Sequence, residues 1–158
     1  LRRFHLDELP QFWNVLVGDM SLVGPRPNVQ ADVDLYTEEE KRLLSVRPGI
    51  TDFSSIVFSD EGEILRGSED PDLRYNQVIR PWKSRLGLLY IENSSLLLDI
   101  RLILLTVVAI TSKQSALRGI CAILKSLHAD EALVQAAARE KPLEPFPPPG
   151  ATAIATSR

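Results

Sequence analysis

The chain has 158 residues, 44% of them hydrophobic, which is enough for one domain with a buried core. Its formal net charge is −3 and its basic residues are scattered, so the composition does not indicate a nucleic-acid-binding protein. A single cysteine, Cys121, excludes an internal disulfide and a cysteine-rich metal site.

The first expected helix begins at two adjacent acids, Asp7 and Glu8. Asp7 is a good N-cap residue, and apolar side chains then recur at helical spacing as far as Gly18. Local chemistry favours helix capping with a favourable dipole interaction. The same N-terminus presents two carboxylates beside free backbone N–H groups, with the cations of Arg2 and Arg3 one turn upstream, which is a suggestive pattern for a binding or catalytic site.

A stiff turn follows this helix. Pro25 and Pro27 fix the backbone on either side of Arg26, so its guanidinium is carried on a rigid support. Two roles for Arg26 stay open from the sequence: a surface ion pair, or phosphate binding.

Two further elements are expected before residue 60. Thr37 and Glu40 have the spacing of a capping box, which predicts a helix to about residue 46. Residues 53–58 are rich in aromatic and β-branched side chains and predict a short strand.

Capping and proline signals also place the next two helices. Asp70 and Pro71 predict a helix to about residue 79, and Pro81 separates it from a second helix that ends near residue 92. Trp82 and Tyr90 share one broad face of that second helix, where they could be core residues or interfacial aromatics.

The most apolar segment runs from Leu96 to Ile110, after a capping serine at position 94 or 95. A membrane-spanning helix needs about 20 apolar residues, and this segment is shorter and carries Asp99 and Arg101. We therefore expect a helix that packs in the core or lies in a membrane interface.

The C-terminal part has two kinds of sequence. Residues 116–139 predict helix with a break near residues 128–130, whereas the proline-rich residues from 142 onwards cannot hold a helix and predict a flexible tail. The expected fold is mainly α with a short β element.

Three blocks of sequence resemble the bacterial sugar transferase family and occur in the family's order. They are LDELPQFWNVLVGDMSLVGPRP at residues 6–27, RPGIT at residues 47–51 and YIENSSLLLDI at residues 90–100. The resemblance implies a compact helical catalytic domain over residues 1–112, with amphipathic helices at a membrane interface. A helical extension over residues 113–141 and a disordered tail over residues 142–158 would follow.

The resemblance implies an activity and a set of site residues. Members are monotopic phosphoglycosyl transferases, which move a sugar 1-phosphate from a nucleotide sugar, here expected to be a UDP-sugar, to polyprenyl (undecaprenyl) phosphate. The product starts exopolysaccharide, capsule, O-antigen or glycoconjugate synthesis. Asp7 would be the nucleophile that forms a covalent phosphosugar intermediate and Glu8 its partner; both would bind Mg²⁺. Arg2 and Arg26 would bind phosphate.

The implied location is the cytoplasmic face of the bacterial inner membrane, with the membrane surface as a further partner and self-association left open. Because the chain opens on the signature without a methionine, we expect an N-terminally truncated domain. Relatives carry upstream a segment that dips into the membrane, together with further active-site residues.

The chain departs from the family pattern at two places. Residues 52–60 lack the glycine-rich, arginine-bearing sequence of many relatives, and Gly87 stands where many have an acid, so the roles of that arginine and that acid do not carry over.

The expected N-terminal truncation favours an alternative, a non-catalytic fragment that acts as a membrane-surface or partner-binding module. A soluble phosphate-binding regulator is a weaker third hypothesis.

Overall fold

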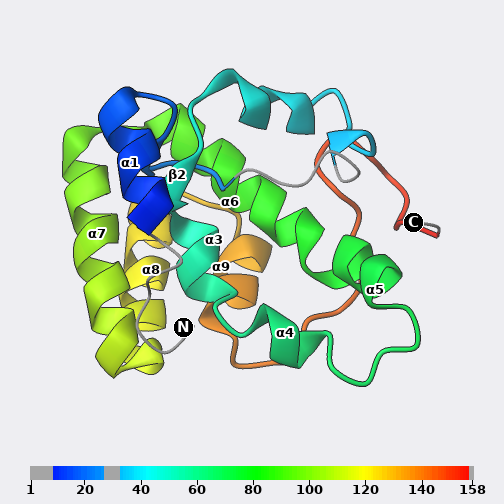
Figure 1. The fold of residues 1–158 in the computed structure, drawn as a ribbon. Helices are drawn as coiled ribbons and strands as arrows, with labels where there is room; N and C mark the ends of the chain where they lie inside the picture. The colour runs from blue at the N-terminus through cyan, green and yellow to red at the C-terminus, as the bar shows by residue number, and fades with distance from the viewer. Residues whose placement is uncertain (1–8, 27–32, 157–158) are drawn as a thin grey trace.

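The computed structural model describes residues 9–26 and 33–156, which are mainly helical and include a two-stranded sheet (Figure 1). In chain order the elements are α1 Leu9–Val17, β1 Ser21–Val23, the 3-10 helix η3 Glu40–Ser45, β2 Gly49–Thr51, α3 Phe53–Val57, α4 Glu61–Ile64, α5 Pro71–Val78, α6 Arg80–Asn93, α7 Leu96–Thr111, α8 Lys113–Ser126 and α9 Glu131–Ala138. The expectation of a mainly α fold with a short β element is confirmed.

The sheet consists of β1 and β2, which run parallel with Ser21 opposite Gly49 and Val23 opposite Thr51. The backbones approach closely just beyond β1, where a Cβ atom on Gly49 would collide with the backbone of Gly24. Glycine is therefore required at position 49, and its absence of a side chain lets the Arg26 turn sit against β2.

The predicted strand at residues 53–58 is wrong, because this stretch forms helix α3. Asp52 caps it: the Ser55 backbone N–H donates to the Asp52 carboxylate at 2.8 Å, and the Asp52 N–H donates to the Ser55 hydroxyl at 2.8 Å. This capping box fixes the helical start, and burial of Phe53, Ile56 and Val57 on the core side outweighs their β propensity.

The capping signals predicted within the described residues are confirmed, and helix α1 is present, whereas its expected cap Asp7 lies outside the described residues. The Thr37–Glu40 capping box forms, although it opens the 3-10 helix η3 and not an α-helix. Asp70 caps α5 and Ser95 caps α7. His128, at a left-handed φ of 57°, lies in the break between α8 and α9.

The core lies among α3, α6, α7, α8 and α9. Its fully buried side chains include Phe53, Leu86, Leu102, Ile120 and Leu124. Trp82 and Tyr90 are each 7% exposed, which assigns them to the core and not to an interface.

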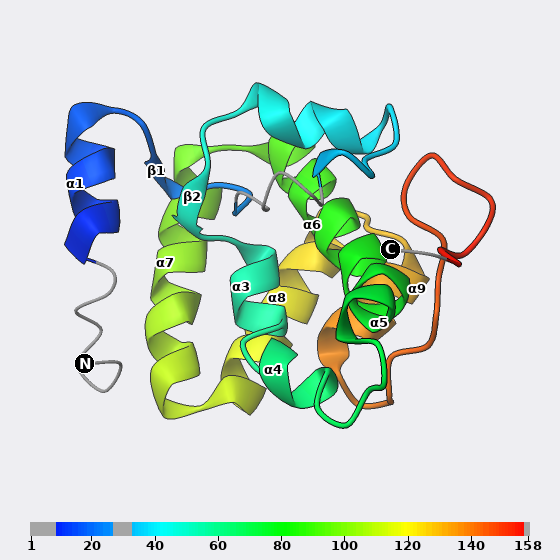
Figure 2. The ribbon, with the colours of Figure 1, turned by 45° about the vertical axis from the view of Figure 1, so that its right-hand side comes forward.

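The prediction of a disordered tail is wrong for residues 142–156, although they contain no helix or strand. The Phe146 ring stacks on Trp82, and Pro148 and Pro149 are buried. Arg85 donates a hydrogen bond to the Pro147 carbonyl at 2.9 Å. The side chains of Thr37 and Gln77 donate to two further carbonyls of the tail. Figure 2 shows this stretch, in orange and red, on the α5 and α9 side, opposite α1 and α7.

Candidate functional site

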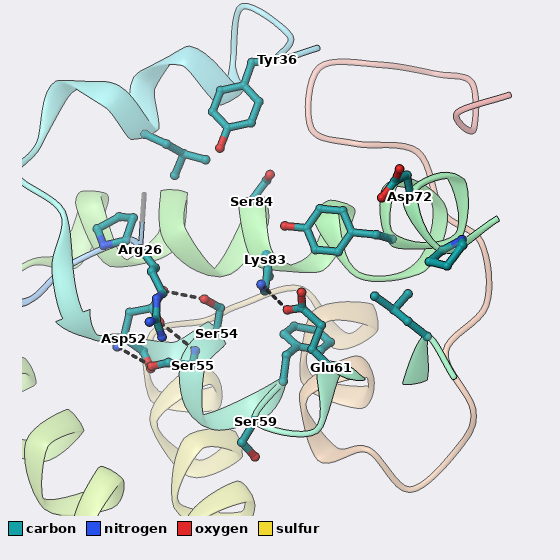
Figure 3. A pocket seen from close by; sticks show the side chains of 16 residues that line it. Arg26, Tyr36, Asp52, Ser54, Ser55, Ser59, Glu61, Asp72, Lys83 and Ser84 are labelled. Carbon is teal, nitrogen blue, oxygen red and sulfur yellow. Dashed lines mark hydrogen bonds and ion pairs between the residues drawn. The ribbon is translucent and has the colours of Figure 1, made fainter. Parts of the chain in front are cut away.

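The predicted site residues fall into two groups. Arg2, Asp7 and Glu8 lie outside the residues that the structure describes, so their roles stay predictions. Arg26 is described and exposed, and it lines a cavity of about 580 Å³ (Figure 3). Cavities of this size are typical of sites for small-molecule ligands.

Five parts of the chain bring the walls of this cavity together. Its lining comprises Pro25, Arg26, Tyr36, Leu43, Asp52, Ser54, Ser55, Phe58, Ser59, Glu61, Leu65, Pro71, Asp72, Tyr75, Lys83 and Ser84. They come from the turn after β1, the segment around η3, the α3–α4 region, α5 and α6. Tyr75 and Lys83 were not predicted from the sequence; the available signal was a few polar side chains within the largely buried α6 and its neighbour α5.

Asp52 and the serines of α3 form one wall. Asp52 is 2% exposed, and its carboxylate accepts hydrogen bonds from the Ser54 hydroxyl at 2.6 Å and from the Ser55 N–H at 2.8 Å. The carboxylate is therefore satisfied as a helix cap. Among the described residues, no group of three or more His, Cys, Asp or Glu side chains could hold a metal ion.

A second wall depends on a buried ion pair between η3 and α6. Glu40 and Arg80 are 0% and 4% exposed and share two hydrogen bonds, of 2.5 and 3.0 Å. Ser84, which lines the cavity, donates to Glu40 at 2.6 Å, and Arg80 also donates to the Leu35 carbonyl at 2.6 Å. This network fixes the segment that carries Tyr36 against α6.

Gly87 explains one departure from the family pattern. A Cβ atom at this position would lie 2.7 Å from Leu43 Cδ2 and 3.6 Å from Pro25 Cβ. The missing side chain allows η3 and the Arg26 turn to pack directly on α6. An acid at position 87 would therefore require the Leu43 side chain to shift, whereas Pro25 would be in ordinary contact.

The third signature block contributes a structural contact. The Tyr90 hydroxyl donates to Asp99 Oδ1 at 2.7 Å and lies 3.4 Å from the Val23 carbonyl, so α6, α7 and β1 meet here. Burial, followed by the bond to Asp99, raises the pKa of Tyr90. Asp99 is half-buried and accepts this bond from Tyr90, whereas Arg101 is exposed.

The cations of the cavity have different surroundings. Arg26 is exposed, whereas Lys83 is half-buried and its Nζ lies 2.5 Å from Glu61 Oε2. The same Nζ lies 5.2 Å from the centroid of the Tyr75 ring. In Figure 3, Lys83 and Glu61 point toward one another.

A wide apolar surface lies away from the cavity. Large apolar side chains on α1 and α7 are exposed, with Leu16 at 80% and Leu96 and Ile110 each at 77%. Figures 1 and 2 both show α1 and α7 on the same side of the molecule. Surfaces of this kind mark protein or membrane interaction sites. Within the described ranges, no helix has the length and apolar character that crossing a bilayer requires.

Comparison with known families agrees with the three sequence blocks. A family model described as bacterial sugar transferase matches residues 1–113. The chain belongs to this family. The sugar transferase match ends near the α7–α8 junction, so α8, α9 and the tail lie beyond it.

Individual sugar transferases are similar over the same region. The chain is 38% identical over 107 residues to an uncharacterized sugar transferase, EpsL, of Bacillus subtilis (strain 168), covering 68% of the chain and 45% of the relative. It is 40% identical over 119 residues to a UDP-glucose:undecaprenyl-phosphate glucose-1-phosphate transferase of Xanthomonas campestris pv. campestris, covering 73% and 22%. It is 34% identical over 110 residues to a UDP-N-acetylgalactosamine-undecaprenyl-phosphate N-acetylgalactosaminephosphotransferase of Aeromonas hydrophila, covering 68% and 23%. The chain thus spans less than half of each relative.

Proposed function

We propose that the protein containing this chain transfers a sugar 1-phosphate from a UDP-sugar to undecaprenyl phosphate. The observation that carries the proposal is the position of Arg26, which comes from the family signature and lines a cavity of about 580 Å³. Two relatives are named for this reaction with different UDP-sugars, so the family and the cavity support the reaction class and leave the sugar open.

The proposed reaction has two displacement steps at one phosphorus atom. A carboxylate oxygen of Asp7 bonds to the phosphorus that carries the sugar, the bond to the bridging oxygen breaks, and the nucleoside monophosphate leaves. A phosphate oxygen of the polyprenyl phosphate then attacks the same phosphorus. This restores the Asp7 carboxylate and gives a polyprenyl diphosphate sugar, with ping-pong kinetics.

Other side chains have supporting roles in this proposal. Glu8 lies beside Asp7 in the sequence, and Arg2 and Arg26 bind the phosphate groups through their guanidinium N–H donors. Arg26 is well suited because its proline-braced turn packs against β2 and α6. Mg²⁺, bound by Asp7 and Glu8, would neutralise charge on the diphosphate.

The apolar surface of α1 and α7 supports a membrane location for the reaction. The acceptor is a lipid, and the exposed side chains of α7 could enter the headgroup region without a spanning helix. We propose that this surface rests on the cytoplasmic face of the inner membrane.

The test is to trap the intermediate. Full-length protein incubated with a UDP-sugar and Mg²⁺, but without lipid acceptor, should gain the mass of one phosphosugar on the peptide that contains Asp7. Added undecaprenyl phosphate should then remove that mass and yield the lipid product. A protein that forms neither the adduct nor the lipid product from any UDP-sugar would instead support the non-catalytic binding module.

A further inference from the structure

The charge balance of the cavity is unfavourable for a diphosphate as it stands. Its described lining residues include the cations Arg26 and Lys83 and the acids Asp52, Glu61 and Asp72. A diphosphate group adds further negative charge. The diphosphate binds more tightly if one of these acids stops neutralising a cavity cation.

The three acids differ in how they are held. Asp52 is buried and caps α3, and Asp72 is exposed on the first turn of α5. Glu61 makes an ion pair with Lys83, in which the side chains are 35% and 23% exposed. Glu61 is therefore the acid that forms an ion pair with a cation of the cavity, Lys83.

The Glu61–Lys83 pair is also the kind of pair that can exchange. It has a single N–O contact and is partly open to solvent, and such pairs contribute little to stability. The nearby Glu40–Arg80 pair is buried, makes two hydrogen bonds, and holds the wall together. Of these two pairs, only the one with Lys83 can open at low cost.

We propose that Lys83 is a diphosphate-binding residue, held by Glu61 in the free protein and transferred to the donor's diphosphate when the donor binds. This inference rests on the proposed function. The flexible four-carbon stem of Lys83 allows a change of partner, and its ammonium group is a common phosphate ligand. Arg26 contacts the donor from the turn after β1, and Lys83 from α6.

The proposed exchange predicts whether each substitution raises or lowers the affinity for a diphosphate. Glu61 competes with the ligand for Lys83, so removing the Glu61 charge should increase affinity for a diphosphate. Removing the Lys83 charge should decrease it. If the pair were only structural, the two substitutions would have similar, small effects on ligand binding.

The experiment measures binding of inorganic pyrophosphate and of UDP to the full-length protein by titration calorimetry. Lys83→Gln should weaken both affinities roughly tenfold, which corresponds to one charge-assisted hydrogen bond. Glu61→Gln should strengthen them several-fold, and the double variant should bind like Lys83→Gln. Thermal unfolding of each variant checks that it is folded, and Lys83→Arg should keep most of the affinity.

Lys113→Gln is the matched control. Lys113 forms an ion pair with Asp60 at 2.8 Å, and these two side chains are about as exposed as Lys83 and Glu61. Asp60 directly precedes Glu61 in the acidic segment, and Lys113 does not line the cavity. This variant should bind both ligands like the wild type. Equal affinities in wild type and Lys83→Gln, weaker binding in Glu61→Gln, or no binding by the wild type would each overturn the proposal.

The two proposals can fail separately. Pyrophosphate binding that depends on Lys83, in a protein that transfers no phosphosugar, would overturn the proposed function and leave this inference standing. If the wild-type protein transfers phosphosugar but Lys83→Gln binds pyrophosphate as tightly as the wild type, the proposed function stands and the role of Lys83 is overturned.

Discussion

Trp82 on α6 and Phe146 in the C-terminal tail stack with their ring centroids 4.5 Å apart. The guanidinium of Arg85 lies 4.8 Å from the Phe146 centroid and 5.6 Å from that of Trp82, so the charge rests on both rings. Phe146 also donates its backbone N–H to the Gln77 carbonyl at 3.0 Å. These contacts hold a proline-rich segment on the body without any regular secondary structure.

Phe146→Ala tests whether the tail contributes to stability. Loss of the stacked, half-buried ring should lower the free energy of unfolding by about 1–3 kcal/mol, measured by urea denaturation. Ile154→Ala, at a tail side chain that is 41% exposed, is the control and should change stability by less than about 0.5 kcal/mol. Equal stability in the two variants would restore the expectation of a flexible tail.

Glu40→Gln should destabilise the fold strongly. It leaves the guanidinium of Arg80, which is 4% exposed, without its charged partner, and such a loss costs about 3–5 kcal/mol. The double variant Glu40→Leu, Arg80→Met should recover much of this stability in thermal unfolding. If the single variant melted like the wild type, the buried pair would not hold η3 on α6.

Arg26→Lys should reduce turnover roughly tenfold or more although the charge is kept, because the planar bidentate donor is lost. Transfer of radiolabelled phosphosugar into lipid measures the effect. Arg118→Lys, at an exposed position on α8 beyond the family match, should leave the rate unchanged. Full activity in Arg26→Ala would remove Arg26 from the site.

Asp7→Asn separates chemistry from helix capping. Asparagine caps helices about as well as aspartate, so the variant should unfold at the same temperature as the wild type. Its activity should fall by orders of magnitude, because an amide cannot attack phosphorus. Glu8→Gln should be comparably severe. A fully active Asp7→Asn enzyme would rule out the covalent route through Asp7.

Leu104→Asp tests the apolar surface of α7. Leu104 is 60% exposed, so a carboxylate there should leave the fold intact and reduce sedimentation with vesicles of anionic lipid several-fold. Ala122→Asp, at an exposed position on α8, is the control and should bind vesicles like the wild type. Equal sedimentation of both variants would show that α7 does not contact lipid.

Local signals predicted those parts of the fold that depend on neighbouring residues. Caps set helix starts within one turn: Asp70 was predicted correctly, and Ser95 was one of the two adjacent serines that the sequence offered as a cap. The strand at residues 53–58 was wrong because β propensity is weaker than a capping box combined with burial. The tail was wrong because its binding surface, around Trp82 and Arg85, lies far away in the sequence.

The candidate site divides in the same way. Arg26 could be predicted because a contiguous motif carries it, whereas Lys83 and Tyr75 reach the cavity only through the packing of α5 and α6. The spacing of these residues in the sequence does not predict that they line the same cavity. The roles of Arg2, Asp7 and Glu8 depend on the family resemblance and stay predictions.

The return of the tail to the body has a consequence for protein engineering. The tail's backbone carbonyls accept hydrogen bonds from the side chains of Thr37, Gln77 and Arg85. These three residues lie inside residues 1–113, whereas the tail lies outside the family match. A chimera that joins the first 113 residues to the C-terminal part of another family member would lose the tail carbonyls that accept these three hydrogen bonds. It would also expose the indole ring of Trp82, which Phe146 covers. Recombination between relatives should therefore carry the last 45 residues together with η3, α5 and α6, as a single inherited block.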